Sequence, residues 1–183
     1  MIFTQIYSKD YPKNKINNYS YQSNFFYHII LTTKKNNEGW NFDFQKTPFL
    51  QPFNKSVKEL LFQSYKESAE YYVIKDIRNL EIAVLVIGKQ NWNNTARLHN
   101  INIFNEDNRK IGIGTEIIQF AENRAKTWNY RSIVLECQSS NYPAVQFYLK
   151  CGYQLTGFDA IAYSNNDIEK HEVRLEMSKM LRK

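Results

Sequence analysis

A glycine turn between a strand pattern and a helix pattern most restricts the fold of this 183-residue chain. The apolar run 98–104 is typical of a strand, and 115–128 carries apolar residues at helical spacing. Between them lies the sequence Arg109-Lys110-Ile111-Gly112-Ile113-Gly114. Glycines let a ligand approach the backbone closely, and the first amides of a helix have no partner within the helix. The layout therefore predicts an anion site for a phosphate-bearing cofactor.

The length and hydropathy pattern favour one domain, 1–183, that does not enter a membrane. Within it, residues 1–22 are expected to be poorly structured or to supply an edge strand at Ile2–Tyr7. No apolar run approaches the ~20 residues that a membrane helix needs, and the N-terminal stretch lacks the apolar core of a signal peptide. We therefore expect a soluble, cytoplasmic protein with no membrane partner.

The charge balance leaves the type of partner open until the motifs are considered. The net charge is +6, which can indicate a nucleic-acid binder. However, the lysines and arginines are scattered and form no basic run with interleaved aromatic residues, so we expect no nucleic-acid partner. A polyanionic small cofactor accounts for the same excess of positive charge. The two cysteines, Cys137 and Cys151, are too few for a disulfide framework, and no metal-ligand spacing is present.

The rest of the chain reads as strands and helices that alternate without a domain boundary. Helical spacing of apolar residues predicts a helix over 56–70, with Ser56 and Glu59 as a capping box, after chain breaks at Pro48 and Pro52. A helix is also expected over 143–150, in addition to the one after the glycine turn. Strands are expected over 25–33, 40–45, 71–75, 80–89, 96–104, 132–138, 154–163 and 172–180. This order predicts an α/β (α+β) fold, a mixed sheet with helices packed on it.

Two common phosphate-binding motifs do not fit the glycine turn. A nucleotide P-loop needs four residues between its glycines, whereas one residue separates Gly112 from Gly114. A dinucleotide fold needs a third glycine, and that position is occupied by Ile117. The hairpins that precede the turn are also wrong for a doubly wound sheet.

Two signatures, in order and separated by one strand, resemble those of the GCN5-related N-acetyltransferase (GNAT) superfamily. The first is Arg109-x-x-Gly112-x-Gly114, which is similar to the pyrophosphate turn of that family. The second is the run 141–153, with Asn, then Ala, then Phe-Tyr, then Gly and an aromatic residue. The segments 37–42, 91–94 and 135–138 narrow the resemblance to the streptothricin acetyltransferase group. One departure is His99-Asn100, where that group usually carries adjacent acidic residues.

The resemblance implies a single GNAT domain with a splayed mixed sheet that binds acetyl-CoA or coenzyme A. The pantetheine arm would pair with the backbone of one strand, and the pyrophosphate would contact Arg109 and the amides of the glycine turn. Asn141, which also suits a helix cap, would contact coenzyme A together with other residues of the second signature. The implied cofactor-binding residues are Ile101, Asn102, Ile103, Arg109, Lys110, Ile111, Gly112, Ile113, Gly114, Thr115, Asn141, Ala144, Phe147 and Tyr148.

The same resemblance makes Tyr148 the candidate general acid. An amine that attacks the thioester releases a thiolate, and a phenol beside the sulfur can protonate it. The incoming amine must lose a proton, for which Glu136, His99 or a water relay are the candidates. Because direct transfer needs no covalent enzyme intermediate, neither cysteine is proposed as a nucleophile.

The sequence therefore predicts an acetyl-CoA-dependent N-acetyltransferase that acts on a primary amine, with a streptothricin-like antibiotic as the leading acceptor. A peptide, protein or polyamine amine is the alternative acceptor. A non-catalytic, coenzyme A-binding regulatory module is the alternative from another functional class. The sequence leaves open whether the protein forms a homodimer.

Overall fold

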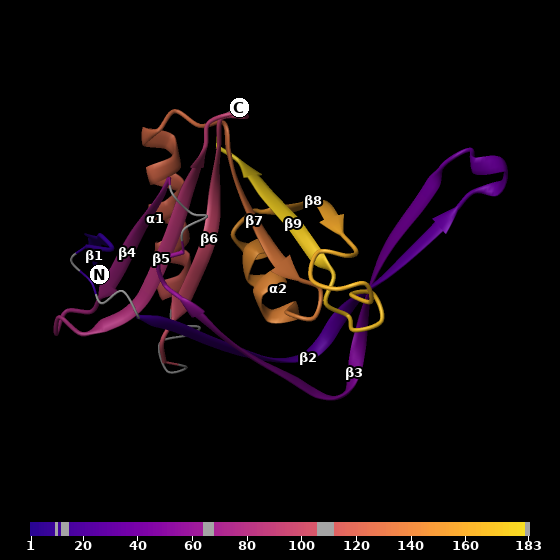
Figure 1. Cartoon of the computed structure of the whole chain (residues 1–183), viewed down its shortest axis with the longest axis horizontal. Coiled ribbons are helices and arrows are strands. Elements are labelled where there is room, and N and C mark those ends of the chain that lie inside the picture. The colour runs from indigo at the N-terminus through magenta and orange to yellow at the C-terminus, as the bar shows by residue number, and fades with distance from the viewer. Residues whose placement is uncertain (10, 12–14, 64–67, 106–111, 182–183) are drawn as a thin grey trace. The chain divides into compact units, whose positions relative to one another are not determined.

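The computed structural model describes residues 1–9, 11, 15–63, 68–105 and 112–181, without the side chain of residue 37. A seven-stranded sheet has the hydrogen-bonded order β1-β4-β5-β6-β7-β9-β8, and β2 and β3 form a separate two-stranded sheet (Figure 1). The elements are β1 (Ile2–Ile6), β2 (Ile16–Thr33), the 3-10 turn η1 (Lys35–Asn37), β3 (Trp40–Leu60), β4 (Ala69–Lys75), β5 (Glu81–Gln90), β6 (Thr95–Ile103), α1 (Ile113–Thr127), β7 (Ser132–Gln138), α2 (Tyr142–Lys150), β8 (Gln154–Asp159) and β9 (Arg174–Met180). The expected mixed sheet with packed helices is confirmed.

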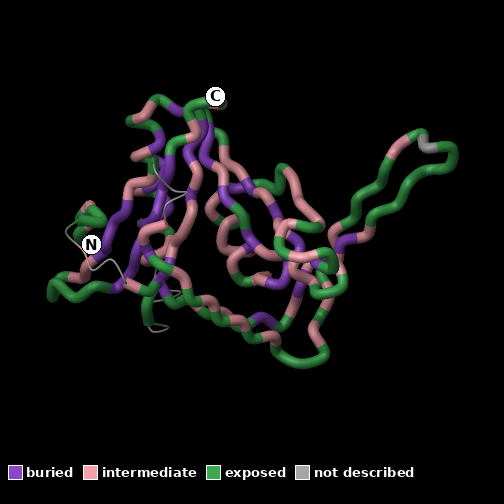
Figure 2. The backbone as a smooth tube through the Cα atoms, viewed as in Figure 1, coloured by how far each residue is buried: buried purple, intermediate pink, exposed green. Residues whose placement is uncertain are grey.

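The chain divides into two compact units. The first comprises Met1–Ser20, Ser56–Leu135 and Ser178–Lys183. In it β1, β4, β5 and β6 are antiparallel neighbours, and β6 then pairs in parallel with β7. The central strand β5 is buried along most of its length, as the tube in Figure 2 shows. A continuous apolar run is what a strand covered on both faces requires.

Helix α1 packs on this sheet through an apolar stripe at helical spacing. Ile117, Ala121 and Ala125 are fully buried. The ring of Phe120 stacks on that of Phe3, with centroids 4.2 Å apart, and also meets Tyr72 edge-on. The glycine turn therefore leads into a helix whose position is fixed by the core.

The second unit comprises Tyr21–Lys55 and Glu136–Met177. It contains most of the long β2–β3 hairpin, helix α2, strand β8 and most of β9. Phe42 and Phe44 of β3 pack edge-on against Phe158 of β8, with centroids 5.3 and 5.4 Å apart. Aromatic contacts of this kind attach the hairpin to the rest of its unit.

The predicted helix over 56–70 is wrong, and so is its capping box. Residues up to Leu60 belong to β3, and Ala69–Lys75 forms β4. Along β3, Lys55, Val57 and Glu59 are partly buried, and the residues between them are exposed. Burial that alternates with a period of two residues is typical of a strand. Pairing of β3 with β2 therefore outweighs the helical spacing of a few apolar residues.

The expected chain breaks at Pro48 and Pro52 are also wrong, because both prolines lie inside β3. Among the strands that the structure describes, β3 pairs with β2 alone. Proline is tolerated in a strand where its missing N–H would have faced solvent. Both prolines are exposed, which agrees with this position.

An ion pair holds α1 against β4. The guanidinium of Arg124 donates to both carboxylate oxygens of Glu70, at 2.7 and 2.8 Å, and Tyr72 donates to the same carboxylate at 2.6 Å. Burial by itself would raise the pKa of Glu70, but these hydrogen bonds and the charge of Arg124 outweigh it and lower the pKa. The charged pair therefore stabilises the fold above the ordinary pKa of the carboxyl.

We expect Glu70→Gln to lower the free energy of unfolding near neutral pH by about 1–2 kcal/mol, because the side chain of Arg124 is 35% exposed and solvent screens the pair. A lowered pKa means that this stabilisation is present above pH 4.5 and disappears as the pH falls through the folded-state value. Urea unfolding near neutral pH and at about pH 3 should show the two proteins converging in acid. The exposed Glu38→Gln is the control, and an equal loss in both variants would contradict the assignment.

Candidate functional site

The glycine turn lies at the start of α1. Gly112 is the N-cap residue, with φ of 97°, and the amide of Glu116 donates to its carbonyl at 3.2 Å. The amides of Ile113, Gly114 and Thr115 precede this first helical bond, so the helix offers them no acceptor. A Cβ built at Gly112 would meet nothing within 4 Å, so the backbone conformation, and not crowding, favours glycine there. The turn therefore has donors for an anion, and the described residues leave the space over Gly112 open. Arg109, Lys110 and Ile111 lie outside the described residues.

The strand before the turn is β6, and its Ile101, Asn102 and Ile103 pair with Leu85, Val84 and Ala83 of β5. The parallel register with β7 joins Thr95–Leu98 to Ser132–Leu135. The side chain of Asn102 is buried and donates to Asn17 Oδ1 at 2.6 Å and to the Asn18 carbonyl at 2.8 Å. The Asn102 side chain therefore anchors the start of β2.

His99 occupies a bulge in β6. Val86 pairs with Asn100 and Ile87 pairs with Leu98, so His99 is the additional residue. Its imidazole lies directly over Gly88 of β5, where a Cβ would meet His99 Nε2 at 2.6 Å. Bulges commonly redirect a side chain beside a functional site. The structure therefore gives His99 a defined position that depends on the absence of a side chain at Gly88.

Next to His99, Asn100 contacts a residue that sequence reasoning had assigned to a helix cap. Asn100 Nδ2 donates to Glu59 Oε1 at 3.1 Å, and Gln63 Nε2 donates to Glu59 Oε2 at 3.0 Å. The sequence contains no local signal for this contact, because Glu59 and Asn100 are 41 residues apart. Only the course of β3 brings the carboxylate to β6.

The second signature forms α2 and the turn before it. Asn141 Oδ1 accepts from the Ala144 amide at 3.3 Å, which confirms the expected cap of a helix with proline in its first turn. Tyr148 lies between two aromatic neighbours, with ring centroids 5.3 Å from Phe147 and 5.9 Å from Tyr153. Burial raises the pKa of Tyr148, and Cys137 and Cys151 add to the shift. The phenol therefore keeps its proton at neutral pH, as a general acid must.

Cys137 does not have the properties of a nucleophile. The thiol is buried, and burial raises its pKa to about 12. The thiolate is the reactive form, and it is scarce far below that pKa. This environment agrees with a reaction that proceeds without a cysteinyl intermediate.

Glu136, near the end of β7, belongs to an ionic group. Its carboxylate is 4.0 Å from Arg174, whose guanidinium also lies 3.3 Å from Asp159 and 3.3 Å from Glu176. The Glu136 side chain is 41% exposed. Glu136 therefore shares the guanidinium of Arg174 with two other carboxylates.

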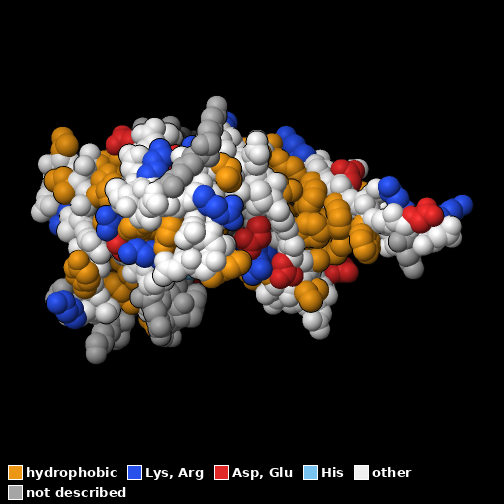
Figure 3. Space-filling model, turned by 90° about the horizontal axis from the view of Figure 1, so that it is seen from above, with side chains coloured by type: hydrophobic (Ala, Val, Ile, Leu, Met, Phe, Trp, Pro, Cys, Tyr) orange, Lys and Arg blue, Asp and Glu red, His pale blue; other side chains and the backbone are white. Residues whose placement is uncertain are grey.

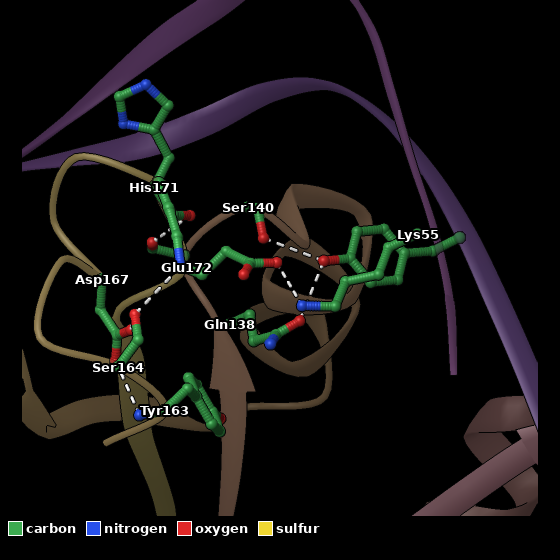
Figure 4. A network of polar contacts seen from close by, with 11 residues as sticks. Lys55, Gln138, Ser140, Tyr163, Ser164, Asp167, His171 and Glu172 are labelled. Atoms are coloured by element: carbon green, nitrogen blue, oxygen red, sulfur yellow. Dashed lines mark hydrogen bonds and ion pairs between the residues drawn. The ribbon is translucent and has the colours of Figure 1, made fainter. Parts of the chain in front are cut away.

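A polar network fixes the turn between β7 and α2, and sequence reasoning missed its members (Figure 4). The hydroxyls of Tyr21 and Ser140 are 2.9 Å apart, and Tyr21 also donates to Gln138 at 3.0 Å. Lys55 and Glu172 form an ion pair beside them. Ser139 Oγ donates to the His171 carbonyl at 2.7 Å. The network holds the start of α2, and hence Asn141, through contacts distant in sequence.

Other kinds of site receive no support within the described ranges. No group of three His, Cys, Asp or Glu residues there could hold a metal ion. None of the helices described is both long enough and apolar enough to cross a membrane. A surface cavity of about 700 Å³ lies beside β1 and β4, lined in part by Ile6, Tyr7 and Tyr71, and contains none of the expected site residues.

Comparison with curated proteins finds two streptothricin acetyltransferases. The chain is 31% identical over 84 residues to streptothricin acetyltransferase of Escherichia coli, covering 46% of this chain and 48% of that protein. It is 34% identical over 77 residues to streptothricin acetyltransferase A of Bacillus subtilis (strain 168), covering 42% and 44%. The matches therefore span about half the length of these curated relatives.

Solved structures resemble nearly the whole chain. A crystal structure of nourseothricin acetyltransferase superposes with a TM-score of 0.75 at 17% identity, covering 99% of this chain and 98% of that one, which shows a shared fold. A putative streptothricin acetyltransferase from Bacillus anthracis str. Ames in complex with acetyl coenzyme A has a TM-score of 0.71 at 25% identity, covering 98% and 96%.

The model of one family, described as the acetyltransferase (GNAT) family, matches residues 22–153. The match includes the glycine turn, His99, the cap Asn141 and Tyr148. Because it covers well over half of the chain, the protein belongs to the acetyltransferase (GNAT) family.

Proposed function

We propose that the protein is an acetyl-CoA-dependent N-acetyltransferase that moves an acetyl group directly to a primary amine. The observation that carries the proposal is the glycine turn at the start of α1, with the open space over Gly112, in a member of the acetyltransferase (GNAT) family. The relative from Bacillus anthracis, which is similar over 98% of this chain, was solved with acetyl coenzyme A.

In this proposal the amides of Gly112, Ile113, Gly114 and Thr115 hold the pyrophosphate, with Arg109, Lys110 and Ile111 completing the turn. The positive end of the α1 dipole adds to the attraction. The backbone of Ile101, Asn102 and Ile103 pairs with the pantetheine arm. The turn into α2 supplies Asn141, and the helix itself supplies Ala144, Phe147 and Tyr148. Acetyl-CoA provides the activated acetyl group as a thioester.

The chemistry assigned to the protein is proton transfer. The nitrogen of the neutral amine attacks the thioester carbonyl, the C–N bond forms and the C–S bond breaks. Tyr148 gives its proton to the leaving sulfur and is reprotonated from water. His99, Glu136 or a water relay takes the proton that the amine loses. The phenol of Tyr148 is protonated at neutral pH, so a proton is available for the thiolate.

A streptothricin-like antibiotic is the proposed acceptor, on the strength of two streptothricin acetyltransferases among the relatives. The face seen in Figure 3 shows Lys and Arg side chains dispersed among Asp and Glu, which supports a small acceptor over nucleic acid. We also propose a cytoplasmic location. Cys137 and Cys151 are not joined in a disulfide, as is usual in a reducing compartment. Whether the enzyme works as a homodimer is a question for sedimentation analysis.

The test is release of free thiol from acetyl-CoA over a panel of amines that contains streptothricin, spermidine, a lysine peptide and an aminoglycoside. Turnover with streptothricin supports the proposal in full. Turnover with the peptide or spermidine alone supports an N-acetyltransferase but contradicts streptothricin as its acceptor. If no amine of the panel is acetylated, while acetyl-CoA still raises the melting temperature, the result favours a coenzyme A-binding module without catalysis.

A further inference from the structure

Among the described residues, the groups that hold the carboxylate of Glu59 are neutral. It accepts one hydrogen bond from Asn100 Nδ2 at 3.1 Å and one from Gln63 Nε2 at 3.0 Å. Both donors are side-chain amides, which satisfy hydrogen bonds but do not neutralise the charge. The geometry orients the carboxylate toward β6 and leaves its charge uncompensated.

Within the described part of the chain, no Lys, Arg or His forms an ion pair with Glu59. Other acids, such as Glu70, Glu81 and Glu122, each pair with a cation. Glu59 is partly buried on the inward face of β3, whereas its neighbour Lys58 is exposed. A partly buried charge without a partner costs free energy, and a cationic ligand would remove that cost.

Asn100 supplies a second acceptor at the same place. Its Nδ2 donates a hydrogen bond to Glu59, whereas its Oδ1 is buried and has no hydrogen-bond partner among the described residues. An unpaired buried acceptor also costs free energy. An ammonium carries three donors and no acceptor, so one ammonium can serve both Glu59 and Asn100 Oδ1.

We propose that Glu59 and Asn100 form a subsite that binds an ammonium group of a polycationic acceptor, an inference that rests on the proposed function. The amine that attacks the thioester must be neutral, whereas a carboxylate favours the charged form. The subsite therefore takes a second amino group of the acceptor, which stays charged throughout the reaction. Acceptors with two or more amines are selected over single amines.

The test is Glu59→Gln, which removes the charge and keeps an oxygen to accept from Asn100. The new NH2 group replaces the oxygen that accepted from Gln63, whose own amide can turn to accept from it. We expect KM for spermidine and for streptothricin to rise about tenfold or more. KM for acetyl-CoA and kcat/KM for butylamine, which has a single amine, should stay within about twofold. The melting temperature should not fall, because an uncompensated charge has been removed. Glu169→Gln, which removes an exposed carboxylate, is the matched control and should behave as the wild type.

Equal KM values for spermidine and streptothricin in wild type and Glu59→Gln would overturn the subsite while leaving the acetyltransferase intact. If no acceptor is turned over, calorimetric titration with the same two compounds separates the two proposals. Binding that weakens about tenfold in the variant supports the subsite even though the proposed reaction has failed. Binding that is equal in both proteins, or absent from the wild type, overturns the subsite.

Discussion

Tyr148→Phe is expected to lower kcat for acetyl transfer by about 10²–10³-fold, because proton donation by a positioned acid contributes that order of rate. The change removes one oxygen from a side chain whose ring packs between Phe147 and Tyr153. The packing is kept, so the affinity for coenzyme A and the melting temperature should stay close to those of the wild type. Steady-state kinetics together with calorimetric titration of coenzyme A would measure both quantities.

The control for this experiment is Tyr163→Phe, since Tyr163 is exposed and has no assigned role. The pH profile provides a second check. Burial raises the pKa of Tyr148 above its ordinary value of 10, so its proton is present throughout the neutral range. The kcat of Tyr148→Phe should therefore stay below that of the wild type throughout the neutral range. Unchanged turnover in Tyr148→Phe would remove Tyr148 from the mechanism.

Gly88→Ala should displace the imidazole of His99 and lower the free energy of unfolding by about 1–3 kcal/mol. The new methyl group would lie 2.6 Å from His99 Nε2 and 3.0 Å from Cδ2, closer than packed atoms tolerate. Gly88 itself is buried on β5, which leaves the imidazole as the group that must move. Urea unfolding would measure the loss. The NMR signals of the three histidines would show whether His99 moves selectively.

Gly157→Ala is the matched control, because Gly157 is also a strand glycine. A methyl group there would meet the Cβ of Glu176 at 3.7 Å, an ordinary contact. Alanine lowers the conformational entropy of the unfolded chain, so this variant should be as stable as the wild type or slightly more stable. If both variants lost stability equally, or if the His99 signals stayed in place in Gly88→Ala, the packing of His99 over Gly88 would not constrain its position.

The parts of the fold that the sequence predicted well are those with a strong local signal. Helix α1 has a glycine start and an apolar stripe that matches its buried residues. Helix α2 has an asparagine cap and an early proline. Strand β7 is nearly continuously apolar. In each case the residues that decide the structure lie next to one another in the chain, so pattern and packing agree.

The segment 56–70 shows where local patterns fail. A few apolar residues and the Ser56–Glu59 spacing indicate a helix, but the backbone of β3 pairs with β2, which lies tens of residues earlier. Because the segment was predicted as a helix, nothing in the sequence indicated that Glu59 contacts Asn100. That contact exists only because the segment is extended. Tyr21 was missed in the same way, since its partners Gln138 and Ser140 are 117 and 119 residues away. Residues whose partners are distant in the sequence do not form a local spacing pattern, so the sequence alone does not predict their contacts.

The prolines of β3 also bear on how the protein behaves at high concentration. A two-stranded ribbon exposes the outer edge of each strand, and an open edge can recruit a strand from another molecule. Pro48 and Pro52 have no N–H to offer such a strand, and both stand in exposed positions of β3. The same residues that the sequence predicts as chain breaks therefore leave β3 without two of the N–H donors that a strand from another molecule would need.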